Sequence, residues 1–397
     1  MKLTLSQKFI AVEDDLNDVL IERTEEVHSA MLALAAKRHL FMFGSPGVAK
    51  SFLVDELVRR INANCFKWLL TKFSVPEELY GGPDLLTLKD KGIYRRVTDG
   101  KLPQADIAFL DEAFKANSAI LNSLLKILNE NEFDNPGDDP HVPLISLFAA
   151  SNELPASSEL EALADRLHLW HHVSPVKDPA NFIKMLSMEP SEPKAFLSIQ
   201  EIQQAQTEVA KVVVPEEVNG ALLELRENLH AMEIKVTDRK FMQALSVIRA
   251  EAWLNGKTEA DVSDTKPLMH MMWRDVGQIS NVRKAVLDLA DPIERDVIKL
   301  RDEWEEAYAE YRKTLSDPEM SGRKSDHTME IYRKYKSART ELRDLNTKRQ
   351  ELGRQCKPLE QFMNKLKEVG PILLEEGFGM DQDQAREMEN NADGGNK

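Results

Sequence analysis

The stretch Gly44-Ser45-Pro46-Gly47-Val48-Ala49-Lys50-Ser51 decides the fold. It follows the apolar run HLFMFG at 39–44 and precedes a helical pattern from residue 51 to 61. A glycine-rich loop between a strand and a helix is the context of a phosphate-binding loop, because its N–H groups and the helix N-terminus bind phosphate oxygens. We therefore expect these eight residues to bind ATP, with Lys50 at the β- and γ-phosphates and the Ser51 hydroxyl on Mg²⁺.

One position of this loop departs from the usual pattern. Ala49 precedes the lysine, where glycine is usual. An alanine is accommodated there if its φ is negative, so we expect Ala49 to change the loop little.

Further apolar runs predict the sheet that carries this loop. They lie at 65–71, 107–112, 144–152 and 166–173, with helical patterns between them, and residues 5–37 are predicted to be helical. Strands that alternate with helices predict a parallel, doubly wound sheet buried on both faces. The expected fold class is α/β, with a five-stranded parallel sheet.

Two carboxylates end the run IAFLDE, and an amide ends the run LFAASN. The carboxyl ends of parallel strands face the ligand crevice. Asp111 is therefore expected to bind Mg²⁺ through water, and Glu112 to orient or deprotonate the attacking water. Asn152 is a candidate for binding that water and the γ-phosphate, or else a strand-end residue that forms a turn.

Two arginines have alternative interpretations. Arg166 follows Asp165 and either pairs with it or points at a neighbouring subunit's nucleotide as an arginine finger. Arg239 follows Asp238 at a predicted helix start, where it either reaches the γ-phosphate or is a surface residue of a capped helix.

Three histidines surround Trp170. On a strand, His168 and His172 share one face and His171 faces the other. Without further partners this is not the geometry of a metal site, and we expect packing or surface roles.

The rest of the chain is predicted to be helical. Residues 1–178 form the expected ATP-binding domain, 179–277 an all-α lid, 278–379 a helical hairpin or bundle, and 380–397 a disordered tail. In the third region apolar residues recur at alternating spacings of four and three, which predicts a seam between packed helices. The pattern forms two arms, separated near Asp317-Pro318 and Ser321-Gly322. Arg349 is the one polar residue on this seam. Phe362, Leu366 and Val369 predict a third helix.

Composition excludes several classes. The 397 residues carry 52 Lys+Arg against 67 Asp+Glu, a net charge of −15, which argues against non-specific duplex binding. The two cysteines are too few for a disulfide framework. No apolar run reaches the ~18–20 residues of a membrane helix, and no signal peptide is apparent. The expected location is cytoplasmic.

The order and context of these motifs resemble a known family. GSPGVAKS, IAFLDE, LFAASNELPASSELEALADRL and VTDRKFMQAL are similar to the MoxR class of AAA+ ATPases, most of all to its RavA branch, over residues 5–277. The resemblance assigns Lys50 and Ser51 to the Walker A motif, and Asp111 and Glu112 to Walker B. It makes Asn152 sensor 1, Arg166 the arginine finger and Arg239 sensor 2.

The resemblance also implies an assembly and partners. It predicts a hexameric ring with ATP and Mg²⁺ at subunit interfaces, chaperone-like remodelling of a partner protein, and a von Willebrand A-domain protein as co-factor protein. It predicts a β-hairpin insertion around residues 81–103 and a second insertion around 131–142. Trp170 replaces a second arginine of the RavA branch, and the β-rich insertion of its C-terminal region is missing.

Two alternative functions remain at this point. The basic residues Lys72, Lys89, Lys91, Arg95, Arg96 and Lys101 are compatible with a nucleic-acid-stimulated ATPase or with a solvated loop. A nucleotide-dependent scaffold is the other alternative, against which Glu112 and Asn152 argue. The region 283–369 is an arm for a partner, a brace along the ring, or a bundle that closes the lid.

Overall fold

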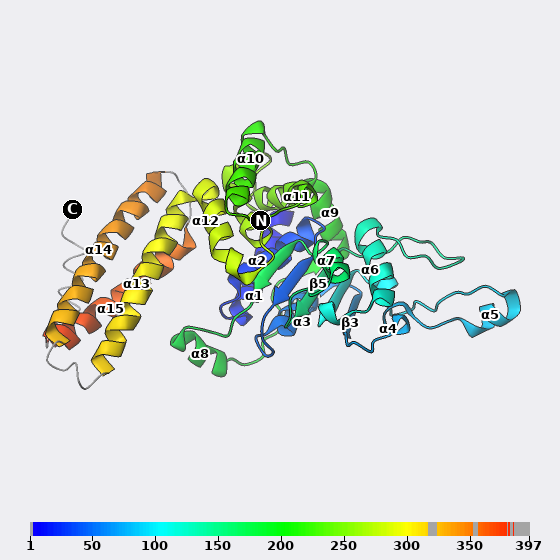
Figure 1. Ribbon diagram of the computed structural model, residues 1–397, viewed down its shortest axis with the longest axis horizontal. Helices are drawn as coiled ribbons and strands as arrows, with labels where there is room; N and C mark the ends of the chain where they lie inside the picture. The colour runs from blue at the N-terminus through cyan, green and yellow to red at the C-terminus, as the bar shows by residue number, and fades with distance from the viewer. Residues whose placement is uncertain (1–2, 317–323, 352–355, 379, 382–383, 385–397) are drawn as a thin grey trace. The chain divides into compact units, whose positions relative to one another are not determined.

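The computed structural model describes residues 3–316, 324–351, 356–378, 380–381 and 384 (Figure 1). The chain divides into two compact units, Met1–Val286 and Leu287–Lys397. The predicted break near Asp317-Pro318 and nearly all of the predicted tail lie outside the described residues.

The first unit is built on a five-stranded sheet. Its strands are β1 (Leu40–Phe43), β3 (Cys65–Leu69), β4 (Ile107–Asp111), β5 (Ser146–Ser151) and β6 (Leu169–His172). They lie in the order β3-β4-β5-β1-β6, and every neighbouring pair is parallel. The predicted fold class and the five predicted strands are confirmed.

Helices surround this sheet. They are α1 (Leu5–Val19), α2 (Thr24–Ala35), α3 (Lys50–Arg59), α6 (Ser118–Glu130) and α7 (Ser158–Ala164). The stretch 5–37, predicted to be helical, is interrupted: α1 ends before a turn in which Glu22 takes a φ of 56°. Helix α2 packs on β1 and β6, and α3 packs on β5, so the short strands are covered by apolar helix faces.

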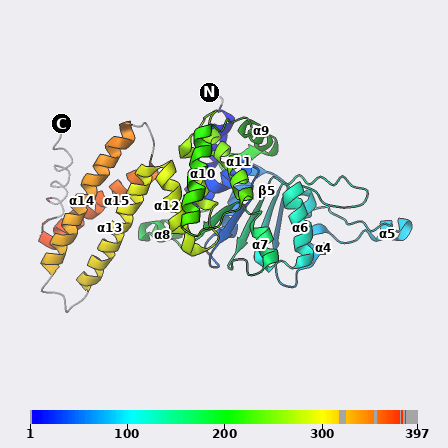
Figure 2. The ribbon, with the colours of Figure 1, turned by 45° about the horizontal axis from the view of Figure 1, so that its top comes forward.

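The first predicted insertion is not a β-hairpin of two strands. Helix α4 (Pro76–Tyr80) leads into a projecting segment with α5 (Leu85–Lys91) near its tip, and η1 (Leu102–Gln104) follows (Figures 1 and 2). The only pairing of its two arms among the described residues is the single antiparallel bridge Pro83–Arg96. Asp84 caps α5 by accepting from the N–H groups of Leu86 and Thr87, which explains a helix at this place.

The second predicted insertion, 131–142, lies where it was expected, directly before β5. Its arms meet at one antiparallel bridge, Glu132–His141. Asn135 joins it to the first insertion, because its side chain accepts from the Arg96 N–H and donates to the Arg96 carbonyl oxygen. Arg95 also pairs with Asp138. The two insertions therefore support each other.

The region 179–277 is not purely helical. Residues Leu197–Ser198 form β7, which pairs in parallel with β2 (Ile61–Asn62) as a separate small sheet. The helices are α8 (Pro179–Leu186), α9 (Ile199–Val209), α10 (Glu216–Ala231), α11 (Asp238–Leu254), η3 (Val262–His270) and η4 (Val276–Gln278). Helices α9 and α11 pack on α1 and α2, so this region shares a core with the N-terminal helices.

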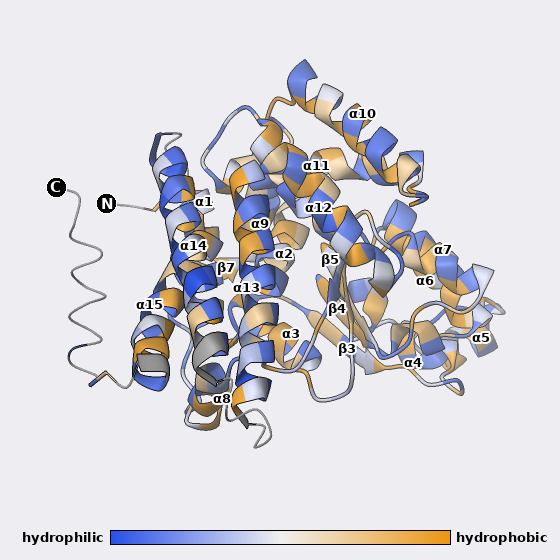
Figure 3. Cartoon of the chain, turned by 60° about the vertical axis from the view of Figure 1, so that its left-hand side comes forward, coloured by the Kyte–Doolittle hydropathy of each residue, from blue (hydrophilic) through white to orange (hydrophobic). Residues whose placement is uncertain are grey.

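The second unit contains three long helices that pack on one another. They are α13 (Pro292–Ser316), α14 (Lys324–Glu351) and α15 (Lys357–Phe378), and α12 (Ile279–Ala290) spans the boundary between the units. The predicted seam is confirmed: Val297, Trp304, Tyr335, Leu342 and Phe362 belong to one buried cluster. In Figure 3 hydrophilic and hydrophobic residues alternate along α13 and α14, as expected for amphipathic helices.

Among the described residues, no helix combines the length and the apolar character needed to cross a membrane.

Candidate active site

The phosphate-binding loop connects β1 to α3, as its sequence predicts. Its first glycine is required by space, because a Cβ at Gly44 would lie 2.3 Å from the carbonyl oxygen of Val173. Gly47 has a φ of +82°, a conformation that a glycine adopts without strain. The loop ends where Lys50 begins α3, so the helix N-terminus faces the loop.

The condition set for Ala49, a negative φ, is not met. Its φ is 68° and its ψ 23°, a left-handed conformation in the residue directly before α3. A residue with a Cβ is disfavoured there by roughly 1–2 kcal/mol. Ala49 is thus a strained residue in a position that suits glycine, and the loop keeps the glycine geometry in spite of the substitution.

Lys50 is anchored by three oxygens. Its Nζ donates to the carbonyl oxygens of Gly44 at 2.5 Å and Ser45 at 3.0 Å, and to Asn152 Oδ1 at 2.9 Å. Burial lowers the pKa of Lys50, and the carboxylates of Asp111 and Glu112 oppose that shift. The ammonium group of Lys50 therefore lies inside the loop, near the carboxylates at the end of β4.

Ser51 and Asp111 form an oxygen pair beside this lysine. The Ser51 hydroxyl donates to Asp111 Oδ2 over 3.4 Å. A hydroxyl and a carboxylate are ligands that Mg²⁺ accepts, usually together with water and substrate phosphates. The donor set thus fits the magnesium ion that the sequence predicts.

Glu112 is held in an unusual position. It has a φ of 54° directly after β4 and before the 3-10 turn η2 (Ala113–Lys115). Its Oε1 accepts from Asn152 Nδ2 at 2.6 Å. Its Oε2 is buried and lies 3.3 Å from Lys115 Nζ, but makes no hydrogen bond. A carboxylate oriented in this way, by an amide on one oxygen and an ammonium group near the other, can accept a proton from a bound water.

These contacts bring together five of the seven predicted catalytic and metal-binding residues. Lys50, Ser51, Asp111, Glu112 and Asn152 come from the loop and from the ends of β4 and β5. All lie at the carboxyl edge of the sheet, because the strands are parallel. The two predicted arginines are elsewhere.

Arg166 and Arg239 meet at the amino edge of the sheet. Asp165, which precedes β6, accepts from Arg239 Nη1 at 3.5 Å, and its Oδ2 lies 4.0 Å from Arg166 Nη1. Strand β6 runs beside β1 with Leu40 opposite Leu169 and Phe43 opposite His172. Since a strand rises about 3.3 Å per residue, the length of β1 separates this edge of the sheet from the loop that follows Phe43. Both arginines lie beside Asp165 at this edge, and their nucleotide roles remain predictions.

A third arginine, Arg274, completes this cluster. Its guanidinium donates to Asp165 Oδ1 at 3.1 Å and to the Ala164 carbonyl oxygen at 2.9 Å. It also lies 4.8 Å from the ring centre of Trp170, a geometry that favours a cation–π contact. Trp170 is fully buried. At this position of β6 the tryptophan ring therefore packs against Arg274 and carries no positive charge of its own.

Sequence reasoning missed three residues of these two sites. Arg274 lies in the tripeptide Trp273-Arg274-Asp275, which carries no motif. Arg23 donates to the carbonyl oxygens of Val48, in the phosphate loop, and Ser174. For Lys115 a weak signal exists, because it follows Glu112 by three residues in a tight turn.

Fold and site together define an AAA+ P-loop protein with a helical lid. The comparisons agree. The model for the "MoxR domain in the MoxR-vWA-beta-propeller ternary systems" matches residues 7–207, and an AAA lid domain matches residues 217–286. The chain belongs to the MoxR family of AAA+ ATPases.

Relatives cover most of the chain. One uncharacterized protein of Methanocaldococcus jannaschii is 34% identical over 90% of this chain and 95% of its own length. Another from the same organism is 38% identical over 74% of this chain and 77% of its own length. A structural protein of Acidianus two-tailed virus is 27% identical over 42% of this chain and 28% of its own length.

A solved structure shows the same fold. The crystal structure of a candidate ATPase from Cytophaga hutchinsonii superposes with a TM-score of 0.57, covering 72% of this chain and 94% of that one. Its sequence identity is 17%, so this likeness concerns the fold.

Proposed function

We propose that this chain hydrolyses ATP to ADP and phosphate in a site shared by two neighbouring chains of a hexameric ring. One observation carries the proposal: the nucleotide-binding residues and the candidate trans-acting arginines lie at opposite edges of one sheet. An arginine at the amino edge cannot contact the nucleotide of its own loop without a large displacement, but it can face the loop of a neighbour.

The residues of the carboxyl edge have distinct roles in this proposal. The loop N–H groups and Lys50 bind the phosphates, and Lys50 exchanges its contacts with Gly44 and Ser45 for phosphate oxygens. Glu112 accepts a proton from the attacking water, while Asn152 orients Glu112 through their 2.6 Å hydrogen bond.

Ser51 and Asp111 would hold the magnesium ion. When bound, that ion neutralises charge on the β- and γ-phosphates. Arg166 and Arg239 would stabilise the charge that develops on the γ-phosphate of the neighbouring chain.

The partner is proposed on the family's description. The matching family model is described as the MoxR domain of MoxR–vWA–β-propeller systems, so we assign a von Willebrand A-domain protein as the partner. Arg239 and Arg274 belong to the lid, and both pair with Asp165. A nucleotide bound at that face would therefore change the contacts of the lid. Such coupling suits chaperone-like remodelling of a further protein, in the manner of the RavA branch.

The structure gives the nucleic-acid alternative no support. Of the six basic residues in the first insertion and its flank, Arg95 pairs with Asp138 and Arg96 with Glu77. Lys101 donates to the Glu78 carbonyl oxygen. Half of the presumed basic surface thus serves contacts within the chain.

The test is ATP turnover against protein concentration, for the wild type, for Arg166→Ala and for a mixture of Arg166→Ala with Lys50→Ala. We expect specific activity to rise steeply with concentration, and Arg166→Ala alone to lose about 10³-fold. The mixture should regain activity, because a site between the two variants can combine an intact loop with an intact arginine. Arg226→Ala, an exposed arginine of the lid that pairs with Asp238, is the control.

A flat concentration curve, with no activity regained in the mixture of the two variants, would show that each chain acts alone. The shared-site proposal would then be wrong.

A further inference from the structure

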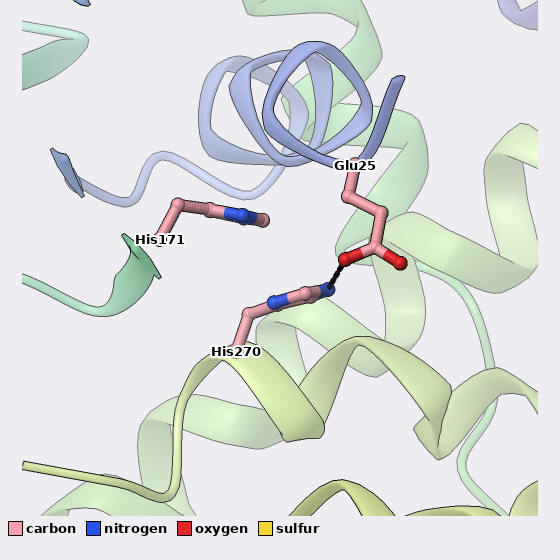
Figure 4. Close-up of side chains that lie close together, drawn as sticks. All are labelled: Glu25, His171 and His270. Carbon is pink, nitrogen blue, oxygen red and sulfur yellow. Dashed lines mark ion pairs between the residues drawn. The ribbon is translucent and has the colours of Figure 1, made fainter. Parts of the chain in front are cut away.

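A second cluster of reactive side chains lies where the lid meets the sheet. Glu25 comes from the first turn of α2, His171 from β6 and His270 from the last residue of η3 (Figure 4). Each offers one ligand atom, and the three atoms lie within 4.8 Å of one another. None of the three takes part in the proposed hydrolysis.

The side chains of this cluster lie close together, and the two stacked rings must rotate before their in-plane nitrogen lone pairs point at one ion. Glu25 Oε2 lies 3.6 Å from His270 Nε2, and the two imidazole rings stack with their centres 4.1 Å apart. His171 Nε2 lies 2.8 Å from the Ser29 hydroxyl. In the tautomer with its hydrogen on Nε2, His171 donates to Ser29 and keeps a free lone pair on Nδ1. An outer hydrogen bond of this kind orients histidines that bind metals.

Burial is the main influence on both imidazoles of the cluster. Burial holds the pKa of His171 and His270 well below the usual range, and His270 and Arg283 respectively add to the effect. His28, nearby on α2, is the opposite case: burial alone would lower its pKa, but Glu251 and Glu13 raise it well above the usual range. His28 is held between these two carboxylates, with Nδ1 on Glu13 and Nε2 on Glu251.

We propose that Glu25, His171 and His270 bind a divalent transition-metal ion of the zinc type. Two imidazole nitrogens and one carboxylate oxygen are a common protein donor set for zinc, with water as the fourth ligand. The half-buried His270 and the exposed Glu25 leave the cluster open to solvent on one side, so an ion and its water can enter.

A resident cation competes with this metal. Arg283 from α12 pairs with Glu25 through its Nη2. A bound metal must share Glu25 with this guanidinium or displace it, and the two positive charges repel each other. The cluster therefore binds a metal more weakly in the wild type than the same donors would without Arg283. The proposal thus predicts that removing this arginine strengthens metal binding.

The site would connect the lid to the nucleotide loop. Glu25 follows Arg23 by two residues, and Arg23 donates to the carbonyl oxygen of Val48 in that loop. His270 ends a lid element. A metal on this cluster would fix the lid to the start of α2, the same segment that supports the phosphate loop.

The experiment uses the full chain, freed of metal with a chelator, and titrates zinc against a colorimetric indicator. We expect one zinc per chain at this cluster. His270→Ala and Glu25→Gln should each weaken binding at least 10-fold, whereas Arg283→Gln should tighten it about 3- to 10-fold. His230→Ala, an exposed histidine of the lid, should leave the affinity unchanged.

Cobalt gives an independent readout. Bound at this cluster, Co²⁺ should show the visible absorption of a four-coordinate ion, and this absorption should be absent in His270→Ala. Glu25→Gln replaces an exposed side chain and tests the site even if His270→Ala fails to fold. A wild type that binds no zinc at micromolar concentrations, or equal affinities in wild type, Glu25→Gln and Arg283→Gln, would overturn the proposal.

Discussion

The two edges of the sheet differ in how their polar groups are used. At the carboxyl edge Lys50, Asp111, Glu112 and Asn152 contact or face one another, and we propose that each takes part in binding or hydrolysing a nucleotide. At the amino edge three guanidinium groups share the single carboxylate of Asp165. The first edge forms a connected site within one chain, whereas the second holds more positive charge than its own carboxylate balances.

The pKa of Arg166 reflects this excess of positive charge. Burial lowers the pKa of Arg166, and the nearby Arg239 lowers it further, while Asp165 works in the opposite direction. Like charges held together in this way favour an anion, and a triphosphate carries several negative charges. The comparison indicates that the amino edge attracts anions, as the proposed site between neighbouring chains requires.

The largest effect should come from the carboxyl edge. Glu112→Gln removes the proton acceptor but keeps the hydrogen bond to Asn152, so we expect ATP turnover to fall about 10³-fold while ATP still binds. Steady-state turnover and binding of a fluorescent ATP analogue measure the two properties. Unchanged turnover would favour the scaffold alternative over an ATPase.

A smaller loss is expected from the amino edge. Arg239→Ala should lower turnover about 10- to 100-fold, because Arg166 remains in place. The decisive measurement mixes Arg239→Ala with Lys50→Ala. If the arginine acts on a neighbour, some sites combine an intact loop with an intact arginine, and activity returns.

If Arg239 serves its own chain's nucleotide, both variants lack one half of every site and the mixture stays inactive. Arg226→Ala should behave as wild type in the same mixtures. Failure of complementation, with both variants folded, would contradict the comparison of the two edges.

The smallest effect concerns the strained loop residue. Ala49→Gly should raise the free energy of unfolding by about 1 kcal/mol, because glycine adopts the left-handed conformation without strain. Ala221→Gly, in the interior of α10, should lower it by about 0.5–1 kcal/mol, since there the glycine only adds unfolded-state entropy. Urea denaturation of both variants checks the opposite signs.

The parts of the site that sequence predicts are those that local rules determine. Apolar runs define the five strands, and a parallel sheet places Asp111 and Asn152 beside the loop without further information. The conformations of Ala49 and Glu112 escape prediction, because local sequence favours a negative φ and the surrounding structure overrides it.

The remaining differences arise from packing between distant segments. Arg239 meets Asp165, and His270 meets His171, only because the lid packs on the N-terminal helices. No spacing in the sequence encodes contacts between residues that are 74 and 99 positions apart. The helix near the tip of the first insertion was missed for a simpler reason: the Asp84 cap was in the sequence, but the family pattern favoured a hairpin.

The separation of the two edges has a consequence for counting. When each chain brings a nucleotide loop on one edge and arginines on the other, an open row of n chains contains n − 1 complete sites and two unmatched ends. Closing the row adds one complete site without adding a chain, and it leaves no free end at which assembly can continue. The position of Asp165 before β6 places the arginines opposite the loop. Ring closure would therefore be detectable as a step in ATP turnover per chain, whatever surfaces hold the chains together.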